Sequence, residues 1–439
     1  MLEFAMPQTT PRPMLRISSR LSSRLGSRRL IALALAALAF AVLLLARYRQ
    51  PDTATLEIVG HALTSPAGTD SSHYMQMGLD AFHAPGHRIF PKLFFADHQK
   101  FIYPPASLFL IEAIRLAPRL HVSPDTARLA LLLVSWLGTL AAAVWFYRDQ
   151  RGSITALEAG SIMLLGVLFL PIAEALYRGQ AQLGLTFLWG LSAILWSRSR
   201  RGWAGFILAI TCAFKPQLAL FLLWGALRKE WRFTGVFAAT ASLIGLCSLA
   251  HFGVQNNLDY FSVLSYLSRH GEALWANQSV NGILNRLLRN GDPMSWNPTV
   301  YPPYRASIYV ISTAFSVAGI LAGLLLPWRN GWAATTADFL FFGCISVVIS
   351  PIAWEHHYGY FFFLLVYLFA RAKRLSRLRW TVLAACTLAM ANRLPPLDHR
   401  LQGPASLVGG YLFYAGLAVL ALLAMEKRDQ RGHRDPNPR

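Results

Sequence analysis

The segment LIALALAALAFAVLLLA, residues 30–46, decides the fold class. It is apolar throughout and nearly as long as the roughly 20 residues that an α-helix needs to cross a ~30 Å hydrocarbon core. Six arginines precede it: Arg12, Arg16, Arg20, Arg24, Arg28 and Arg29. Cytoplasmic flanks of membrane helices are rich in Lys and Arg, so residues 1–29 are interpreted as a basic cytoplasmic arm. An organelle transit peptide is the alternative, because the stretch is also rich in Ser and poor in acids.

Similar apolar segments recur along the rest of the chain. They are 127–147, 156–176, 180–196, 203–214, 216–227, 233–250, 305–326, 336–350, 357–370, 380–391 and 405–425. Of the 439 residues, 54% are hydrophobic and only 14% are charged, a mixture that argues against soluble domains. We therefore predict an all-α polytopic membrane protein of about twelve transmembrane helices, with residues 30–425 as the transmembrane domain.

The net charge of +20 would suggest a nucleic-acid partner in a soluble chain. Here the basic residues lie in short segments beside the apolar ones, so they are better explained by membrane topology, and no nucleic acid is expected. The segment 106–120 is short and charged, which favours an interfacial helix over a span. With that segment outside, 25 of the 41 Lys and Arg residues fall on the cytoplasmic side, including those of a tail at 426–439.

The same topology puts eleven of the twelve histidines on the opposite side. The longest loop there is 48–126, and long polar loops are where binding and chemistry are usually found. It contains Asp70, in Gly68-Thr69-Asp70-Ser71-Ser72-His73-Tyr74. Asp70 is the candidate catalytic acid or base, with a merely solvated carboxylate as the alternative.

Residues 203–227 carry Lys215-Pro216 at their centre. Basic clusters at both ends favour a hairpin of two short helices over one long helix, and a proline disfavours helix at the residue before it. Lys215 would then face a wet cavity inside the bundle, where an unpaired ammonium is costly. We expect an anionic partner, either a ligand phosphate or, as the alternative, Glu174 or Glu355.

Three further polar clusters could contact a ligand. Glu174 and Arg178 form an i,i+4 pair beside a tight turn, which could equally be self-neutralising. His356 and His357 are adjacent and lack metal-ligand spacing, so no metal is expected. The polar stretch 277–282 could hydrogen-bond hydroxyl groups.

Several segments, taken in order, resemble one family: the polyprenyl-phosphate-sugar-dependent glycosyltransferases of family 87, integral membrane enzymes of the GT-C fold. They cover roughly residues 65–360, and the set in this order is more specific than any one member. One departure is Gln182, where the family pattern leads us to expect Asn. The matching segments are Gly68-x-Asp70-x-x-x-Tyr74, Phe101-x-Tyr103-Pro104-Pro105, Gly179-Gln180, Ala204-Gly205 through Lys215-Pro216 to Trp231-Arg232, Asn277-Gln278-Ser279 with Gly282 and Arg286, and Ser350-Pro351-x-x-Trp354-x-His356-His357.

The resemblance implies a GT-C-like bundle and inverting transfer of a hexose, expected to be mannose, from a polyprenyl-phosphate donor. The acceptor would be a hydroxyl of a glycolipid or polysaccharide outside the cytoplasm, at a cell membrane whose lipids surround the enzyme. It implies no cofactor. Asp70 would be the general base; Lys215, Arg178, His356 and His357 would bind the donor phosphate; and Tyr74, Tyr103, Gln180, Asn277, Asn281 and Arg286 would contact substrate.

Two other classes fit a polytopic chain. A lipid or solute transporter would also have many spans, but it should show internal repeats and ionisable residues at midplane positions in both halves. We find no internal repeat. A non-enzymatic scaffold would not need such a set of polar loops.

Overall fold

The computed structural model describes residues 14–47, 54–64, 68–394 and 403–432. Apart from one isolated β-bridge between Asn277 and Trp354, these residues form helices joined by loops, which confirms the all-α class. Parts of the predicted basic arm and tail, residues 1–13 and 433–439, lie outside the described residues.

Five helical stretches are long and apolar enough to cross a membrane. A sixth is formed if α6 (Ala156–Val167) and α7 (Leu170–Tyr177), which meet at 56°, count as one bent span. The chain is therefore a multi-pass membrane protein, while the count of twelve spans stays a prediction. The five belong to α1 (Met14–Arg47), α5 (Pro124–Arg151), α11 (Trp231–Phe252), α14 (Ala306–Arg329) and α19 (Tyr411–Gly432), the last together with the 3₁₀-helix Gly403–Gly410.

Shorter apolar helices complete the bundle. They are α8 (Gln182–Ser197), α9 (Arg201–Cys212), α10 (Leu220–Leu227), α15 (Thr336–Val348), α16 (Phe361–Ala370) and α17 (Arg377–Ala391). Every residue of α16 is buried, so this helix forms part of the central core beside α5 and α15. The predicted division of residues 203–227 is observed, because α9 ends at Cys212 and the 3₁₀-helix η4 (Pro216–Ala219) leads into α10.

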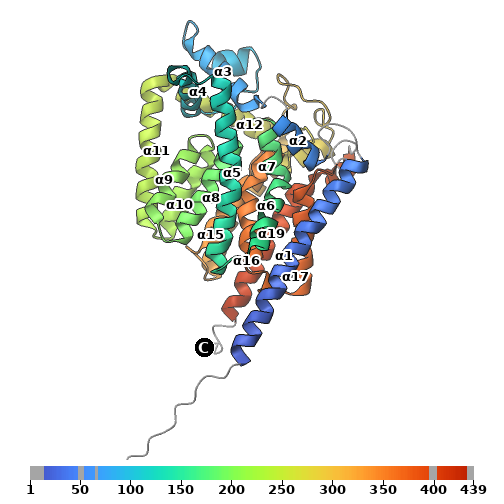
Figure 1. The fold of residues 1–439 in the computed structure, drawn as a ribbon. Helices are drawn as coiled ribbons and strands as arrows, with labels where there is room; N and C mark the ends of the chain where they lie inside the picture. The colour runs from blue at the N-terminus through green and yellow to red at the C-terminus, as the bar shows by residue number, and fades with distance from the viewer. Residues whose placement is uncertain (1–13, 48–53, 65–67, 395–402, 433–439) are drawn as a thin grey trace, which may run out of the picture.

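An outer layer covers one end of the bundle (Figure 1). Its helices are α2 (Thr55–Thr64), α3 (Asp70–His83), η1 (Pro91–Ala96), η2 (Pro105–Leu108), α4 (Phe109–Arg115), η3 (Ala117–Leu120), α12 (Val254–His270) and α13 (Val280–Leu287). Apolar side chains of α3, η1, η2, α4 and α12 pack into a second, smaller core with Phe252 of α11. The segment 106–120 is therefore divided into short helices, none of which is a candidate span, and its interfacial position stays a prediction.

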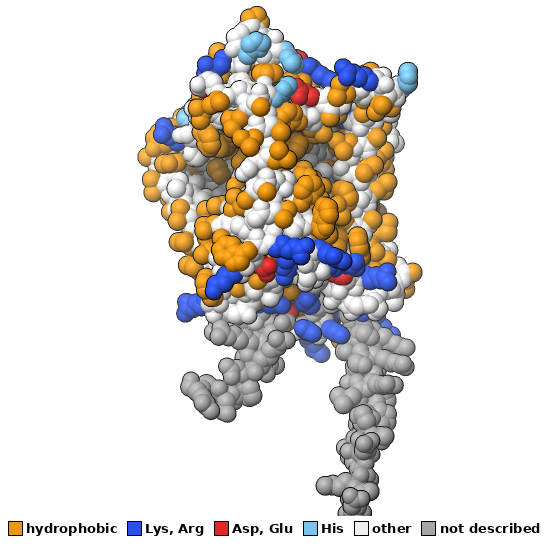
Figure 2. Space-filling model, turned by 90° about the vertical axis from the view of Figure 1, so that its left-hand side faces the viewer, with side chains coloured by type: hydrophobic (Ala, Val, Ile, Leu, Met, Phe, Trp, Pro, Cys, Tyr) orange, Lys and Arg blue, Asp and Glu red, His pale blue; other side chains and the backbone are white. Residues whose placement is uncertain are grey.

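The two ends of the molecule differ in charge. Figure 2 shows an apolar band between them, with a row of Lys and Arg side chains along its lower edge, and with His side chains together with several Lys and Arg side chains at the upper end. The N-terminal end of α1 and the C-terminal end of α19 both lie at the lower end in Figure 1. Which of the two ends faces the cytoplasm stays a prediction.

Candidate active site

A cavity of about 1110 Å³ is lined by residues of both the bundle and the outer layer. Its wall is largely apolar, with charged side chains grouped along part of it. Segments distant in the sequence therefore meet here, as predicted for a ligand site. Eight predicted site residues line it: Asp70, Tyr74, Tyr103, Arg178, Gln180, Lys215, His356 and His357.

Asp70 is held in this wall by the turn between α7 and α8. Gln180 Nε2 donates to Asp70 Oδ2 at 2.5 Å, and the Asp70 backbone N–H donates to the Arg178 carbonyl at 3.0 Å. Ser71 Oγ donates to Gln180 Oε1 at 2.6 Å and lies 2.8 Å from the Tyr103 hydroxyl. The carboxylate thus has a fixed orientation while it faces the cavity.

Glycine makes this close approach possible. Gly179 has φ +66°, in the left-handed region, and a methyl group there would lie 1.8 Å from the Gly68 carbonyl oxygen. A methyl group on Gly68 would lie 2.2 Å from the carbonyl oxygen of Tyr177. Two segments that the family resemblance treats separately, Gly68-x-Asp70 and Gly179-Gln180, are therefore the two sides of one backbone contact.

Burial raises the pKa of Asp70 above its ordinary value. The charge of Arg178, the hydrogen bond from Gln180 and the proximity of His73 oppose this rise, whereas Glu174 adds to it. A carboxylate with a raised pKa is a better proton acceptor than an exposed one, as a general base requires.

Beside Asp70, two acids and two arginines form a connected network, in which the Arg178 side chain is partly exposed and the other three are buried. Glu174 Oε2 accepts a hydrogen bond from Arg178 Nε at 2.6 Å, and Glu174 Oε1 contacts Arg393 Nη2. The same Arg393 nitrogen lies 3.1 Å from Glu355 Oε2. Arg393, only 2% exposed, also lies over the Trp275 ring at 4.9 Å. The predicted Glu174–Arg178 pair is thus confirmed, but it belongs to a larger cluster.

Lys215 lies in a different environment, at the bend of the α9–α10 hairpin. Its Nζ is 2.7 Å from His357 Nε2, and His357 packs edge-on against His356 at 4.8 Å. The alternative prediction, an ion pair with Glu174 or Glu355, is wrong because both acids pair with arginines instead. Among the described residues, no carboxylate lies within ion-pair distance of Lys215.

Residues 101–351, more than half of the chain, match the sequence model of glycosyltransferase family 87. The chain belongs to glycosyltransferase family 87. It is also 27% identical over 236 residues to the polyprenol-phosphate-mannose-dependent alpha-(1-2)-phosphatidylinositol mannoside mannosyltransferase of Mycolicibacterium smegmatis (strain ATCC 700084 / mc(2)155). That alignment covers 50% of each chain, so this family 87 protein spans about half the length of the relative it matches. The family match itself includes Lys215 and Arg178 but neither Asp70 nor Arg393.

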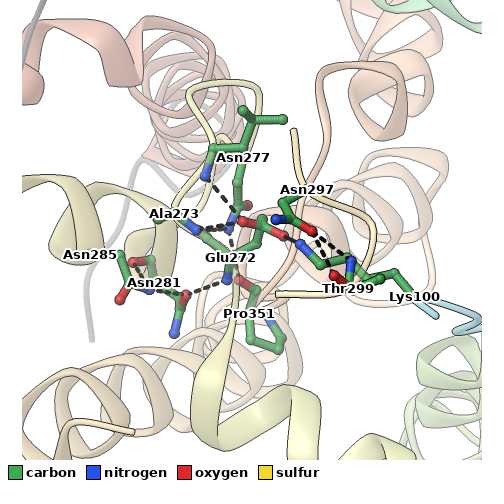
Figure 3. Close-up of polar contacts among 10 residues, drawn as sticks. Lys100, Glu272, Ala273, Asn277, Asn281, Asn285, Asn297, Thr299 and Pro351 are labelled. Carbon is green, nitrogen blue, oxygen red and sulfur yellow. Dashed lines mark hydrogen bonds and ion pairs between the residues drawn. The ribbon is translucent and has the colours of Figure 1, made fainter. Parts of the chain in front are cut away.

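In the family 87 protein, three residues that were predicted to contact the substrate do not line the cavity. Asn277, Asn281 and Arg286 are buried and hold the loop that follows α12. Figure 3 shows Asn277 and Asn281 beside Glu272 of this loop. Asn277 Nδ2 donates to the Glu272 carbonyl at 2.8 Å, and Asn281 Oδ1 accepts from the Glu272 N–H at 3.2 Å. Arg286 Nη1 donates to the Leu274 carbonyl at 3.0 Å. Their observed contacts are structural, and direct contact with substrate stays a prediction.

Sequence reasoning missed Arg393 and the pair Lys100–Glu272. One signal for Arg393 was available: it follows an apolar segment at the end predicted to be extracytoplasmic, where arginine is unfavoured. Lys100 and Glu272 offered none, because a loop ion pair 172 residues apart has no sequence pattern. Within the described part of the chain, no group of three or more His, Cys, Asp or Glu side chains could hold a metal ion.

Proposed function

We propose that this protein is a membrane mannosyltransferase. It transfers mannose from a polyprenyl-phosphate donor to an acceptor hydroxyl of a glycolipid or polysaccharide, with inversion at the anomeric carbon. Membership of family 87 supports glycosyl transfer, and the name of the M. smegmatis relative supports both the sugar and the lipid-phosphate donor.

The observation that carries this proposal is the charge pattern of the cavity. Most of its charged side chains neutralise one another: Lys100 pairs with Glu272, Arg178 and Glu174 pair, and Glu355 meets Arg393. Asp70 and Lys215 instead contact an amide and an imidazole. One cavity thus has an anionic group available for a hydroxyl proton and a cationic group available for a phosphate.

The proposed reaction uses both groups. Asp70 accepts the proton of the acceptor hydroxyl, whose oxygen attacks the anomeric carbon of the donor. The bond from that carbon to the phosphate oxygen breaks, and polyprenyl phosphate leaves with the electron pair. Lys215 and Arg178, with His356 and His357 as hydrogen-bond partners, stabilise the negative charge that this phosphate gains.

The apolar part of the cavity suits the lipid chain of such a donor. Leu223 of α10, Phe261 of α12 and Val317 of α14 line the cavity and are exposed. These positions support a lateral opening through which a polyprenyl chain stays in the membrane while its phosphate reaches Lys215.

We place the reaction on the extracytoplasmic side of a cell membrane. The support is the larger share of Lys and Arg, 25 of 41, in the segments predicted to lie at the other end of the bundle from α3 and α4. On this proposal residues 30–425 form the catalytic domain, and its loop 48–126 supplies the base.

One pair of assays distinguishes a sugar transferase from a lipid or solute transporter. Purified protein in detergent should move radiolabelled mannose from polyprenyl-phosphate mannose to an added glycolipid acceptor. The same protein in sealed proteoliposomes should not accelerate uptake or lipid flipping beyond empty vesicles. Flipping or uptake without sugar transfer would favour the transporter alternative instead.

A further inference from the structure

The outer end of the cavity has an aromatic and charged lining that the transfer steps above do not use. Tyr74 comes from α3, Lys100 from the segment after η1, Glu272 from the loop after α12, and Trp296 and Tyr301 from the loop before α14. We call these five residues the outer chamber. Because Tyr74 follows Asp70 by four residues on α3, the chamber adjoins the proposed base.

A buried ion pair forms the floor of the chamber. Lys100 and Glu272 are 6% and 5% exposed, and Lys100 Nζ lies 2.5 Å from Glu272 Oε2 (Figure 3). Glu272 Oε1 accepts hydrogen bonds from the Ala273 and Leu274 N–H groups at 2.9 and 3.3 Å. A buried ion pair is weak evidence of added stability, because removing two charges from water offsets much of their attraction.

Two aromatic rings flank this pair. Lys100 Nζ lies 4.3 Å from the centre of the Trp296 ring and 4.6 Å from that of Tyr301. The Trp296 ring also packs edge-on against Trp354 at 5.5 Å. The Tyr301 hydroxyl is buried and has no hydrogen-bond partner among the described residues. Tyr301 lines the cavity, and its buried hydroxyl leaves one hydrogen bond to be made.

A pyranose ring suits these groups. It has an apolar C–H face, which packs on an aromatic ring, and a rim of hydroxyls, which hydrogen-bond fixed polar groups. We propose that the outer chamber binds the sugar residue of the acceptor, with Trp296 as the stacking surface and the Tyr301 hydroxyl as a hydrogen-bond partner. This inference rests on the function proposed above.

The position of the chamber favours the acceptor over the donor. The donor phosphate is assigned to Lys215, which comes from the bundle, and its lipid chain to the apolar positions on α10, α12 and α14. The chamber residues come from the outer layer and its loops, beside the carboxylate that would deprotonate the acceptor.

The decisive variant is Tyr301→Phe, which removes one unpartnered oxygen and should leave unfolding unchanged. Octyl mannoside serves as the acceptor probe, and octanol is the matched alcohol without a sugar. Loss of one hydrogen bond should raise the KM for octyl mannoside by about 3- to 10-fold while the KM for polyprenyl-phosphate mannose stays the same. Trp296→Phe should act in the same direction, and Tyr304→Phe, an exposed tyrosine of the same loop, is the control.

A direct titration of octyl mannoside into the purified protein separates this inference from the proposed function. Weaker binding to Tyr301→Phe than to wild type supports the chamber even if no transfer is detected. An unchanged affinity and KM for octyl mannoside in both variants would overturn it. A change in the donor KM alone would overturn it as well, because the chamber would then belong to the donor.

Discussion

Arg393 is buried and Lys215 is half-buried beside the same cavity, and their surroundings are opposite. Arg393 contacts the carboxylates of Glu174 and Glu355, whereas the hydrogen bond of Lys215 among the described side chains is to the His357 ring. A cation whose partners are acids of the same chain holds the fold together. A cation without such an acid is available for an anionic ligand.

The largest expected effect of this difference is on stability. Arg393→Gln leaves Glu174 and Glu355 buried with less compensation, which typically costs about 3–5 kcal/mol. Thermal unfolding in detergent should show a clear fall in the midpoint, and exposed Arg200→Gln should show none. An unchanged midpoint would contradict the claim that Arg393 stabilises the fold, and with it the contrast drawn with Lys215.

Lys215→Gln should have the opposite phenotype. A hydrogen bond to a charged group contributes about 1.5–3 kcal/mol, so donor affinity should fall by about 10- to 100-fold. The unfolding midpoint should stay near that of wild type, because no acid loses its partner. Exposed Lys92→Gln is the control. A large fall in the unfolding midpoint, together with normal donor binding by the protein that stays folded, would contradict the proposal that Lys215 binds the donor phosphate.

These two cations show what the sequence could and could not predict. The position of Lys215 at a hairpin bend followed from local information, because Pro216 and the flanking basic clusters lie within the same short stretch. The partners of Arg393 lie 219 and 38 residues away. No periodicity or charge pattern relates such positions, so the network needed the three-dimensional structure.

The outer layer likewise could be predicted only in part from the sequence. Helices α3, α12 and α13 were predicted only as parts of long loops, since they are short and mostly lack long apolar runs, whereas α4 lies within the predicted interfacial helix 106–120. Asp70 and Gln180 could be named from the family resemblance, but their 2.5 Å contact could not. Asn277, Asn281 and Arg286 carried the same polar signal, although the structure uses them to hold a loop.

A smaller effect is expected at the turn that joins the network to Asp70. Gly179→Ala places a methyl group against Gly68, so it should displace Arg178 and Gln180 and reduce transfer. Gly152→Ala is a matched control, because Gly152 also has positive φ (+88°) but open space around it. Both changes should cost about 1–2 kcal/mol in left-handed strain. Equal activity in the two variants would show that the Gly68–Gly179 contact does not position the base.

The smallest effect should appear in the pH profile. Activity requires ionised Asp70, so kcat/KM should fall as the pH drops through its raised pKa. The charge of Arg178 opposes that rise, so Arg178→Gln should move the acid limb to higher pH, and Arg178→Lys should move it less. An acid limb that stays in place or moves to lower pH would contradict Asp70 as the titrating group.

The central claim is that Asp70 is the general base. The rate of sugar transfer by the Asp70→Asn variant tests it most directly. The amide cannot accept the hydroxyl proton, so the rate should fall by about 10²- to 10⁴-fold. Burial raises the folded-state pKa of Asp70, and a group shifted this way adds stability only at pH values below its folded pKa. At neutral pH the variant should therefore be at least as stable as wild type. Asp80→Asn and Asp97→Asn, exposed acids outside the cavity lining, should keep normal rates. A folded, monodisperse Asp70→Asn protein with more than about a tenth of the wild-type rate would contradict the account.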